Sequence, residues 1–396
     1  MKTVNDFNFK DQRALIRVDF NVPMDEHQKV TDNTRIVAAK PTVDKILADG
    51  GSVILMTHLG RPKGEVKAEY SLKSVVDEIS SVMGKNVKFV GDCVGAEAEA
   101  AAAALQPGEI LLLENLRFHS EEEKGDEEFA AQLAKLGDAY VNDAFGTAHR
   151  AHASTAIIGK YFTNTKFFGL LMAKELEAID KVLKKGEKPV TAILGGSKVS
   201  TKITIIENIL PAIDNLIVGG GMAFTFVKAL GGKIGKSLVE EDKLQLALEI
   251  LEKAKLNNVK VYLPVDAVIT EEFNNDTETK EVDIYDIPEG YMGLDVGKKT
   301  QDDFNDVIMN SRTILWNGPV GVFEMSNFAA GTIALGDSIA ESTKLGAFSL
   351  VGGGDSVAFV KQFGYGEKVS YVSTGGGAML ESLEGLELPG VAAINN

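Results

Sequence analysis

Short runs of Val, Ile and Leu alternate with longer segments of helical periodicity along the whole chain. This alternation is typical of parallel sheets that are covered by helices on both faces. With 396 residues, the chain exceeds a typical domain of roughly 100–200 residues. We therefore predict an α/β protein with two Rossmann-like, three-layer domains. The expected strands are Ala14–Val18, Val53–Met56, Ile110–Leu113 and Ala139–Val141 in the first half, and Val190–Leu194, Leu216–Val218, Val259–Leu263, Thr313–Trp316 and Phe348–Val351 in the second.

The domain boundary is expected near Phe167–Leu171, where an aromatic and polar stretch gives way to a helix from about Met172 to Lys184. Leu176, Ile179 and Leu183 recur in this helix at helical spacing. We expect an N-terminal domain over 1–171 and a C-terminal domain over 172–384 that begins with the connecting helix. The Ala-rich segment 96–105 and the acidic segment 121–128 are expected to be exposed helix or loop without chemistry.

Composition restricts the classes of partner. The net charge of −16 makes the average surface repel nucleic acids and anionic membranes, so an anion site must be concentrated locally. Cys93 is the only cysteine, which excludes an intrachain disulfide and a zinc cluster made of cysteines. The N-terminus lacks the apolar stretch of a secretory signal, and no apolar run approaches the length of a membrane span. These features predict a soluble cytoplasmic protein.

Arginine is concentrated in the first half of the chain. Six of the seven arginines and all five histidines fall within the first 152 residues. Arg17, Arg61, Arg117 and Arg150 each end or follow a predicted strand, and the carboxyl ends of parallel strands form the edge where such folds bind ligands. One such arginine alone would be interpreted as a surface ion pair. Four of them, each able to grip phosphate or carboxylate at two points, predict a site for a small polyanion.

In the second half of the chain, glycine is concentrated at the ends of predicted strands. Predicted strands run directly into Gly195–Gly196, Gly219–Gly221, Asn317–Gly318 and Gly352–Gly354, and Gly375–Gly377 precedes the last helix. Glycines at strand-to-helix turns let backbone N–H groups approach phosphates closely. Each run alone could be a tight turn, but their repetition at several strand ends predicts a nucleotide site.

Two motifs are set aside. The segment LGGKIGKS at 230–237 nearly matches a phosphate-binding P-loop, but Leu230 occupies the position of the first glycine, so we expect an ordinary turn at a helix end. His149 and His152 have the helical spacing of metal ligands without an evident third ligand, which favours a structural or anion-contacting role. The first predicted strand lacks a GxGxxG turn, which disfavours an NAD-dependent dehydrogenase.

In order along the chain, a series of motifs resembles the phosphoglycerate kinase family. The motifs are RVDFNVP at 17–23, TDNTRI at 31–36, HLGRP at 58–62, ENLRF at 114–118, GTAHRAHAS at 146–154, LGGSKVSTKI at 194–203, GGGMAF at 219–224, WNGPVGVFE at 316–324, GGGDS at 352–356 and STGGGA at 373–378. They extend over the whole chain, and none departs from the family at a position used for chemistry. The presence of Arg35, Lys198 and Asp355 argues against a catalytically silent binding protein on a kinase scaffold. Another acyl-phosphate kinase such as acetate kinase is disfavoured, because its small substrate would not need five or more converging cationic groups.

The resemblance implies reversible, Mg²⁺-dependent transfer of the acyl phosphate of 1,3-bisphosphoglycerate to ADP, giving 3-phosphoglycerate and ATP. It implies that the substrate is held by Asp19, Asn21, Arg35, His58, Leu59, Gly60, Arg61, Arg117 and Arg150. The nucleotide would be held by Gly195, Lys198, Lys202, Gly219, Gly220, Asn317, Pro319, Glu324, Gly353, Gly354, Asp355 and Ser356. Asp355 would also bind the metal, and we expect it to act as a helix N-cap after Gly354 as well.

Arg35 and Lys198 are expected to bracket the transferred phosphoryl group from the two domains. Direct in-line transfer needs no general base, because the attacking oxygen of ADP or of the carboxylate is already ionised. Such a reaction requires domain closure about a hinge, for which the helix from Met172 and the segment Ser373–Gly377 are the candidates. The resemblance further implies a monomer and a C-terminal segment, about 385–396, that packs back on the N-terminal domain.

Overall fold

The computed structural model describes residues 1–396 and divides into two compact units. Unit 1 comprises Met1–Leu176 together with Glu387–Asn396, and unit 2 comprises Glu177–Leu386. The division falls within helix α6 (Leu170–Leu183), slightly later than the sequence suggested. Both units are α/β, which confirms the predicted fold class. None of the helices combines the length and apolar character needed to cross a lipid bilayer.

Unit 1 is built on a six-stranded parallel sheet of order β3-β4-β2-β1-β5-β6. Chain order reverses between the neighbours β1 and β5, which makes this pair the switch point where open parallel sheets bind ligands. All of β1 except its first residue is buried, as are all of β2 and β5. The strands are β1 (Arg13–Arg17), β2 (Ser52–Met56), β3 (Val87–Phe89), β4 (Ile110–Leu112), β5 (Ala139–Asn142) and β6 (Lys166–Phe168).

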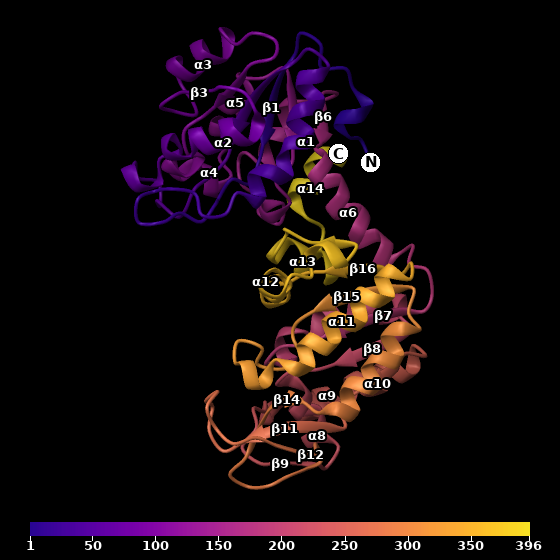
Figure 1. Cartoon of the computed structure of the whole chain (residues 1–396). Coiled ribbons are helices and arrows are strands. Elements are labelled where there is room, and N and C mark those ends of the chain that lie inside the picture. Colours follow the sequence, from indigo (N-terminus) through magenta and orange to yellow (C-terminus); the bar gives the residue numbers. More distant parts are fainter. The chain divides into compact units, whose positions relative to one another are not determined.

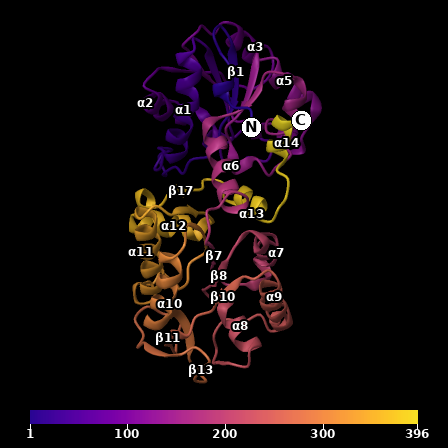
Figure 2. The ribbon, with the colours of Figure 1, turned by 90° about the vertical axis from the view of Figure 1, so that its right-hand side faces the viewer.

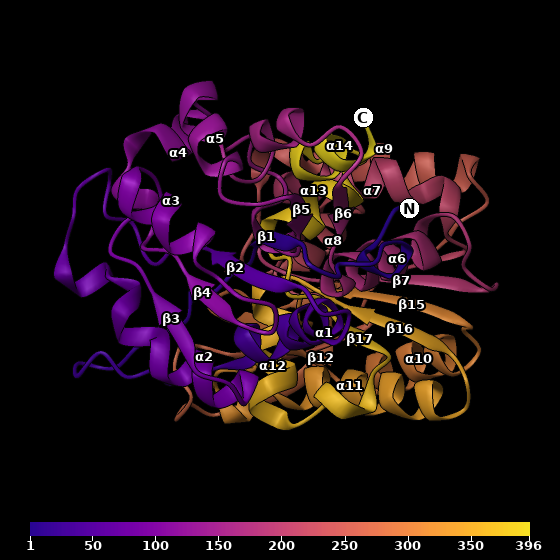
Figure 3. The same ribbon diagram turned by 90° about the horizontal axis from the view of Figure 1, so that it is seen from above.

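Helices cover both faces of this sheet. Helices α1 and α2 lie on one face, and α3, α5 and α14 lie on the other (Figures 2 and 3). The C-terminal helix α14 contacts β6 and the 3-10 helix η6 (Ile157–Tyr161), so the end of the chain belongs to unit 1. The helices are α1 (Thr34–Ala48), α2 (Val76–Met83), α3 (Ala96–Ala103), α4 (Ser120–Lys124), α5 (Glu127–Ala134) and α14 (Pro389–Asn395).

Unit 2 contains a second six-stranded parallel sheet, of order β10-β8-β7-β15-β16-β17. The chain winds outward from β7 in one direction and from β15 in the other, so its switch point lies between β7 and β15. Trp316, fully buried in β15, packs against Phe359 in the core. The strands are β7 (Val190–Leu194), β8 (Asn215–Val218), β10 (Lys260–Tyr262), β15 (Thr313–Asn317), β16 (Phe348–Val351) and β17 (Tyr371–Val372).

The helices of unit 2 also lie on both faces of their sheet. Figure 2 shows α7, α8 and α9 on one side and α10, α11 and α12 on the other. They are α7 (Ile203–Ile209), α8 (Met222–Ala229), α9 (Leu244–Leu256), α10 (Lys298–Met309), α11 (Ala330–Lys344), α12 (Gly354–Phe363) and α13 (Gly377–Leu383).

Unit 2 carries two smaller sheets, drawn at the foot of Figure 1. An antiparallel sheet of order β12-β11-β14 is formed by β11 (Asp266–Thr270), β12 (Lys280–Asp283) and β14 (Met292–Val296). A short parallel pair joins β9 (Lys233–Ile234) to β13 (Asp286–Ile287). The P-loop-like segment 230–237 begins with the expected turn at the end of α8, where Gly231 and Gly232 donate backbone hydrogen bonds to the helix, and it continues into β9.

Candidate functional site

The carboxyl edge of the sheet in unit 1 gathers a cluster of basic residues. Arg17 ends β1, His58 follows β2, and Arg117 lies in the 3-10 helix η4 (Leu116–Phe118) after β4. His152 follows β5, the strand that pairs with β1. Because β4, β2, β1 and β5 are neighbours in this parallel sheet, their carboxyl ends bring these basic side chains together.

Arg17 is fully buried at the centre of this cluster. Its Nε donates to Ser154 Oγ at 2.8 Å, and its Nη1 donates to the carbonyl of Val18 at 2.5 Å. Its Nη2 lies 3.2 Å from Nδ1 of His58. The sequence predicted that Arg17 would help to grip a polyanion, whereas the structure buries it and directs its three nitrogens to protein atoms.

Two histidines are held neutral here. Burial lowers the pKa of His58 well below its usual value, and the charges of Arg17, Arg117 and Arg35 reinforce this effect. Burial likewise lowers the pKa of His152 to about 4, again with help from neighbouring arginines. The buried Nδ1 of His152 and Nε of Arg117 have no hydrogen-bond partner. A basic cluster with unsatisfied nitrogens suits an anionic ligand.

A hydrogen-bonded frame links several of the predicted substrate residues. Arg35 Nη1 donates to Asp19 Oδ1 at 2.9 Å and to the carbonyl of Asn21 at 3.2 Å. The amide N–H of Gly60 donates to Asn21 Oδ1 at 2.8 Å, and its carbonyl accepts from Arg117 Nη1 at 3.2 Å. Asp19, Asn21, Arg35, Gly60 and Arg117 therefore form one connected group.

The remaining substrate candidates differ in their surroundings. Leu59 is buried, and Asn115 bonds both its backbone N–H and its carbonyl. Arg61 is exposed, and no hydrogen bond or ion pair joins it to the basic cluster. Arg150 is also exposed, but its charge helps to lower the pKa of Arg117 and of His152. Arg150 thus interacts electrostatically with the basic cluster, whereas Arg61 has no hydrogen bond or ion pair with it.

One expectation for this region is wrong. The acidic segment 121–128 was expected to be exposed and without chemistry, yet Glu122 is fully buried. Its two carboxylate oxygens accept from the backbone N–H of Ser154 at 2.8 Å and from Ser154 Oγ at 2.6 Å. The acidic neighbours of Glu122 suggested a solvated face, whereas helix α4 turns this one side chain inward beside Arg17.

In unit 2, the loops that follow β7, β8 and β15 contact one another closely at glycine residues. A Cβ atom on Gly195 would lie 2.0 Å from the carbonyl oxygen of Pro319, and one on Gly318 would lie 2.3 Å from the carbonyl of Gly195. Gly220 has φ +70°, and a Cβ there would lie 2.7 Å from the backbone of Gly196. These contacts involve backbone atoms that cannot rotate away, so the loops after β7, β8 and β15 require glycine.

Polar side chains connect these loops. Lys202 Nζ donates to Asn317 Oδ1, and Asn317 Nδ2 donates to the carbonyl of Gly352 at 2.9 Å. Ser356 Oγ accepts from the backbone N–H of Gly318 at 2.6 Å. Burial lowers the pKa of Lys202, and Asp355 opposes this effect.

Several nucleotide candidates lie at the surface, namely Lys198, Glu324, Gly354 and Asp355. No ion pair involves the ammonium group of Lys198, so its charge is available to a ligand. The N-cap interpretation of Asp355 is wrong: Gly353, with φ +94°, occupies the N-cap of α12. Asp355 instead lies in the first turn, where the helix dipole favours a carboxylate.

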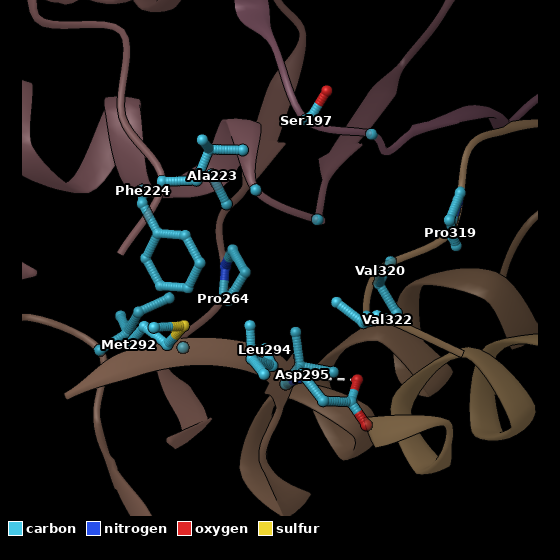
Figure 4. Close-up of a pocket in the computed structure, with 18 of the residues that line it drawn as sticks. Ser197, Ala223, Phe224, Pro264, Met292, Leu294, Asp295, Pro319, Val320 and Val322 are labelled. Atoms are coloured by element: carbon cyan, nitrogen blue, oxygen red, sulfur yellow. Dashed lines mark hydrogen bonds between the residues drawn. The ribbon is translucent and has the colours of Figure 1, made fainter. Parts of the chain in front are cut away.

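A cavity of about 480 Å³ opens beside these loops (Figure 4). One part of its wall consists of loop residues near β7, β8 and β15, among them Gly196, Ser197, Gly220 and Pro319. Phe224, Met292 and Leu294 line an apolar part, and Glu324 and Asp355 contribute carboxylates. An apolar surface that adjoins glycine turns and hard oxygen donors suits a base on one side and phosphates with a cation on the other.

Asp295 also lines this cavity and was not predicted from the sequence. Its two oxygens accept from the N–H groups of Val296 and Gly331, each at 2.8 Å. Burial nevertheless raises its pKa to about 7. The bond to Val296 is drawn in Figure 4.

Unit 1 also contains a separate group of three residues, Asp92, Cys93 and His119, whose potential ligand atoms lie within 4.8 Å of one another. His119 Nε2 already contacts Asp92 Oδ1 at 2.7 Å. Burial raises the pKa of the Cys93 thiol well above its usual value. Because metals bind the thiolate, this donor set does not favour a metal at neutral pH, and we assign none.

Comparisons with known proteins give a consistent result. The family model described as phosphoglycerate kinase matches residues 4–386. The chain is 52% identical to phosphoglycerate kinase of Porphyromonas gingivalis over 99% of both proteins. It is 51% identical to that of Chlorobium chlorochromatii, over 100% of this chain and 99% of the relative. The structure of phosphoglycerate kinase from Coxiella burnetii matches with a TM-score of 0.92 and 40% identity, over 99% of this chain and 98% of that one.

Proposed function

Because this chain belongs to the phosphoglycerate kinase family, we propose that it catalyses the reversible, Mg²⁺-dependent transfer of the acyl phosphate of 1,3-bisphosphoglycerate to ADP. The products are 3-phosphoglycerate and ATP, so the enzyme is a phosphotransferase with a carboxyl group as acceptor. One observation supports this proposal. Each unit has, at the switch point of its sheet, a distinct set of groups that suits an anion, basic in unit 1 and glycine-rich in unit 2.

In unit 1, the basic cluster would bind the phosphoglycerate. Arg117 and Arg150 contribute charge, and neutral His58 can donate to a phosphate or carboxylate oxygen. Asp19 and Asn21 position Arg35, whose side chain remains 40% exposed and can reach a ligand. We assign Leu59, Gly60 and Arg61 to the same substrate site, as the loop that follows β2.

In unit 2, the cavity would bind the nucleotide. Gly195, Gly219 and Gly220 let the loops beside the cavity pack closely together, and Gly220, Pro319 and Glu324 line it. We assign all five to the nucleotide site. Lys202, Asn317 and Ser356 hold the loops that would carry the phosphates. We assign Lys198, Gly353 and Gly354 to the phosphate subsite.

The side chains of the cavity fit a magnesium ion bound together with nucleotide phosphates. Asp355 supplies a hard carboxylate oxygen, and Mg²⁺ commonly binds one or two carboxylates plus substrate phosphates. When bound, the ion would neutralise charge on the phosphate oxygens during transfer. Asp355 would thus have two roles, because it would bind the ion and its negative charge also favours the charged form of Lys202.

The reaction itself needs positioning more than proton transfer. Both possible nucleophiles, an ADP oxygen and a carboxylate, are ionised before they attack, so the residues only align them and stabilise charge. We assign Arg35 and Lys198 to the transferred phosphoryl group. Since these residues belong to different units, transfer requires the two units to approach each other, with α6 and Ser373–Gly377 as the proposed hinge. We propose a cytoplasmic, monomeric enzyme that acts on small molecules.

A coupled assay with 3-phosphoglycerate, ATP and Mg²⁺ tests this function directly. We expect turnover that requires all three components. Acetate in place of 3-phosphoglycerate should give no turnover, because it lacks the phosphate that the basic cluster would bind. Absence of turnover with 3-phosphoglycerate, in protein that melts cooperatively, would contradict the proposal.

A further inference from the structure

Two fully buried residues of opposite charge lie near each other in unit 1 without a direct ion pair. They are Arg17 and Glu122. The hydroxyl group of Ser154 stands between them, 2.6 Å from Glu122 Oε2 and 2.8 Å from Arg17 Nε. Ser154 is itself fully buried. Buried charges are costly unless they are paired or hydrogen-bonded, so this hydroxyl bridge is what joins the two charges.

The donors and acceptors in this bridge have only one consistent arrangement. Arginine has donors alone, and an ionised carboxylate has acceptors alone. The Ser154 hydroxyl must therefore give its proton to Glu122 and accept from Arg17. Glu122 Oε1 meanwhile accepts from the backbone N–H of Ser154 at 2.8 Å. Both oxygens of Glu122 act as acceptors. An amide in place of this carboxylate would point its NH2 group at either the N–H or the hydroxyl group of Ser154, and one of the two hydrogen bonds would be lost.

The same reasoning extends to His58. Arg17 Nη2 lies 3.2 Å from His58 Nδ1 and can only donate to it. The Nδ1 atom is then an acceptor, which leaves the ring proton of the neutral histidine on Nε2. Arg17 cannot turn away from this contact easily, because Ser154 and the carbonyl of Val18 hold its Nε and Nη1.

We propose that Glu122, Ser154 and Arg17 form a hydrogen-bonded chain that fixes His58 as the neutral tautomer with its proton on Nε2. The three are positioning residues, and they act on the anionic substrate through His58. A neutral Nε2–H group offers a phosphate or carboxylate oxygen a fixed hydrogen-bond donor. The tautomer is a property of the free protein, whereas its use in substrate binding rests on the function proposed above.

The charges around His58 all act in the same direction. Arg17 approaches from β1, Arg35 from α1, Arg117 from η4, and His152 from the segment after β5, and each disfavours a second proton on the ring. Burial is the largest contribution. The neutral tautomer should therefore persist through the range from pH 5 to pH 8, where a free histidine would gain or lose its charge.

The first test is nuclear magnetic resonance of the full-length protein labelled at histidine, without ligand. The variant H58Q assigns the His58 ring signals. We expect wild-type His58 to show the Nε2–H tautomer, without titration between pH 5 and pH 8. In S154A, which removes only the bridging hydroxyl, we expect mixed tautomers. E122Q, which keeps the side-chain volume, should act in the same direction and provides the test if S154A does not fold.

The control is E121Q, which removes the neighbouring exposed carboxylate of the same helix and should leave the His58 signals unchanged. A wild-type His58 that carries its proton on Nδ1, or that titrates near pH 6.5, would overturn the proposal. The same conclusion would follow if folded S154A and folded E122Q both kept the wild-type tautomer.

The second test concerns the substrate. In S154A we expect the KM for 3-phosphoglycerate to rise by about tenfold, the size expected when a hydrogen bond to a charged group is lost. The KM for MgATP should stay unchanged, which general damage to the fold would not produce. Equal KM values for 3-phosphoglycerate in S154A and wild type would refute the role in binding. If wild-type enzyme did not use 3-phosphoglycerate, the proposed function would fail, while the resonance experiment would still decide the tautomer.

Discussion

Asp143 is a buried carboxyl group whose replacement should stabilise the protein in a pH-dependent way. It follows β5, its Oδ1 accepts from the backbone N–H of Met172 at 3.1 Å, and its buried Oδ2 has no hydrogen-bond partner. Burial raises its pKa from 3.8 to about 6. This difference of about two pH units corresponds to about 3 kcal/mol between the folded and unfolded chains.

The direction of the effect follows from proton binding. Between about pH 4 and pH 6 the folded protein holds this proton more tightly than the unfolded chain does. The free energy of unfolding therefore falls as the pH rises through this window, and it levels off above the folded pKa. D143N stays neutral at every pH and keeps the oxygen that accepts from Met172. Relative to wild type, the variant should gain about 3 kcal/mol in stability between pH 4 and pH 7.

Equilibrium unfolding by denaturant, at intervals between pH 4.5 and pH 7.5, measures this difference. Most of the gain should appear by pH 6.5. D138N provides the matched control, because the ion pair with Arg13 lowers the pKa of Asp138. Asp138 is therefore ionised in both the folded and the unfolded chain throughout this pH range, so D138N should lower the free energy of unfolding by an amount that does not change with pH. A difference between D143N and wild type that does not change with pH would contradict a raised pKa of Asp143 in the folded protein.

Three further predictions concern the proposed reaction. R35A should lower kcat by orders of magnitude and leave the Kd for ADP unchanged in a binding titration, and a parallel loss of ADP binding would contradict its assignment to the phosphoryl group. G195A should weaken ADP binding at least tenfold, because its Cβ would lie 2.0 Å from the carbonyl oxygen of Pro319; wild-type affinity would show that the loop can shift. D355N should raise the Mg²⁺ concentration needed for half-maximal turnover while the KM for 3-phosphoglycerate stays constant, and an unchanged Mg²⁺ requirement would exclude Asp355 as a ligand.

The features that could be predicted from the sequence are those that depend on local pattern and on the geometry of parallel sheets. The apolar runs gave β7 and β16 with their observed ends. The positions of Arg17 and Arg117 after their strands were enough to place them at one edge, because every strand of a parallel sheet ends on the same side. Glycine runs located the turns of unit 2 in the same way, without knowledge of which strands are neighbours.

The buried acids could not be predicted, because their environment depends on tertiary packing. Glu122 stands among exposed glutamates in the sequence, and only the packing of α4 against the segment that carries Ser154 turns it inward. Asp295 lies in a strand of the small antiparallel sheet, and its sequence neighbours give no sign that it is buried. One of its two hydrogen-bond donors, the N–H of Gly331, comes from the start of α11, far along the chain.

For Glu122, the burial is connected to the basic cluster by a physical rule. Four parallel strands deliver cations to one edge, and a buried cation such as Arg17 must be balanced by a partner that water cannot supply. The hydroxyl group of Ser154 connects Arg17 to Glu122, which comes from helix α4 and not from the strands that carry the cations. A buried arginine at a strand end therefore indicates that an acid must lie nearby in the fold, although the sequence does not reveal which of many acidic residues it is.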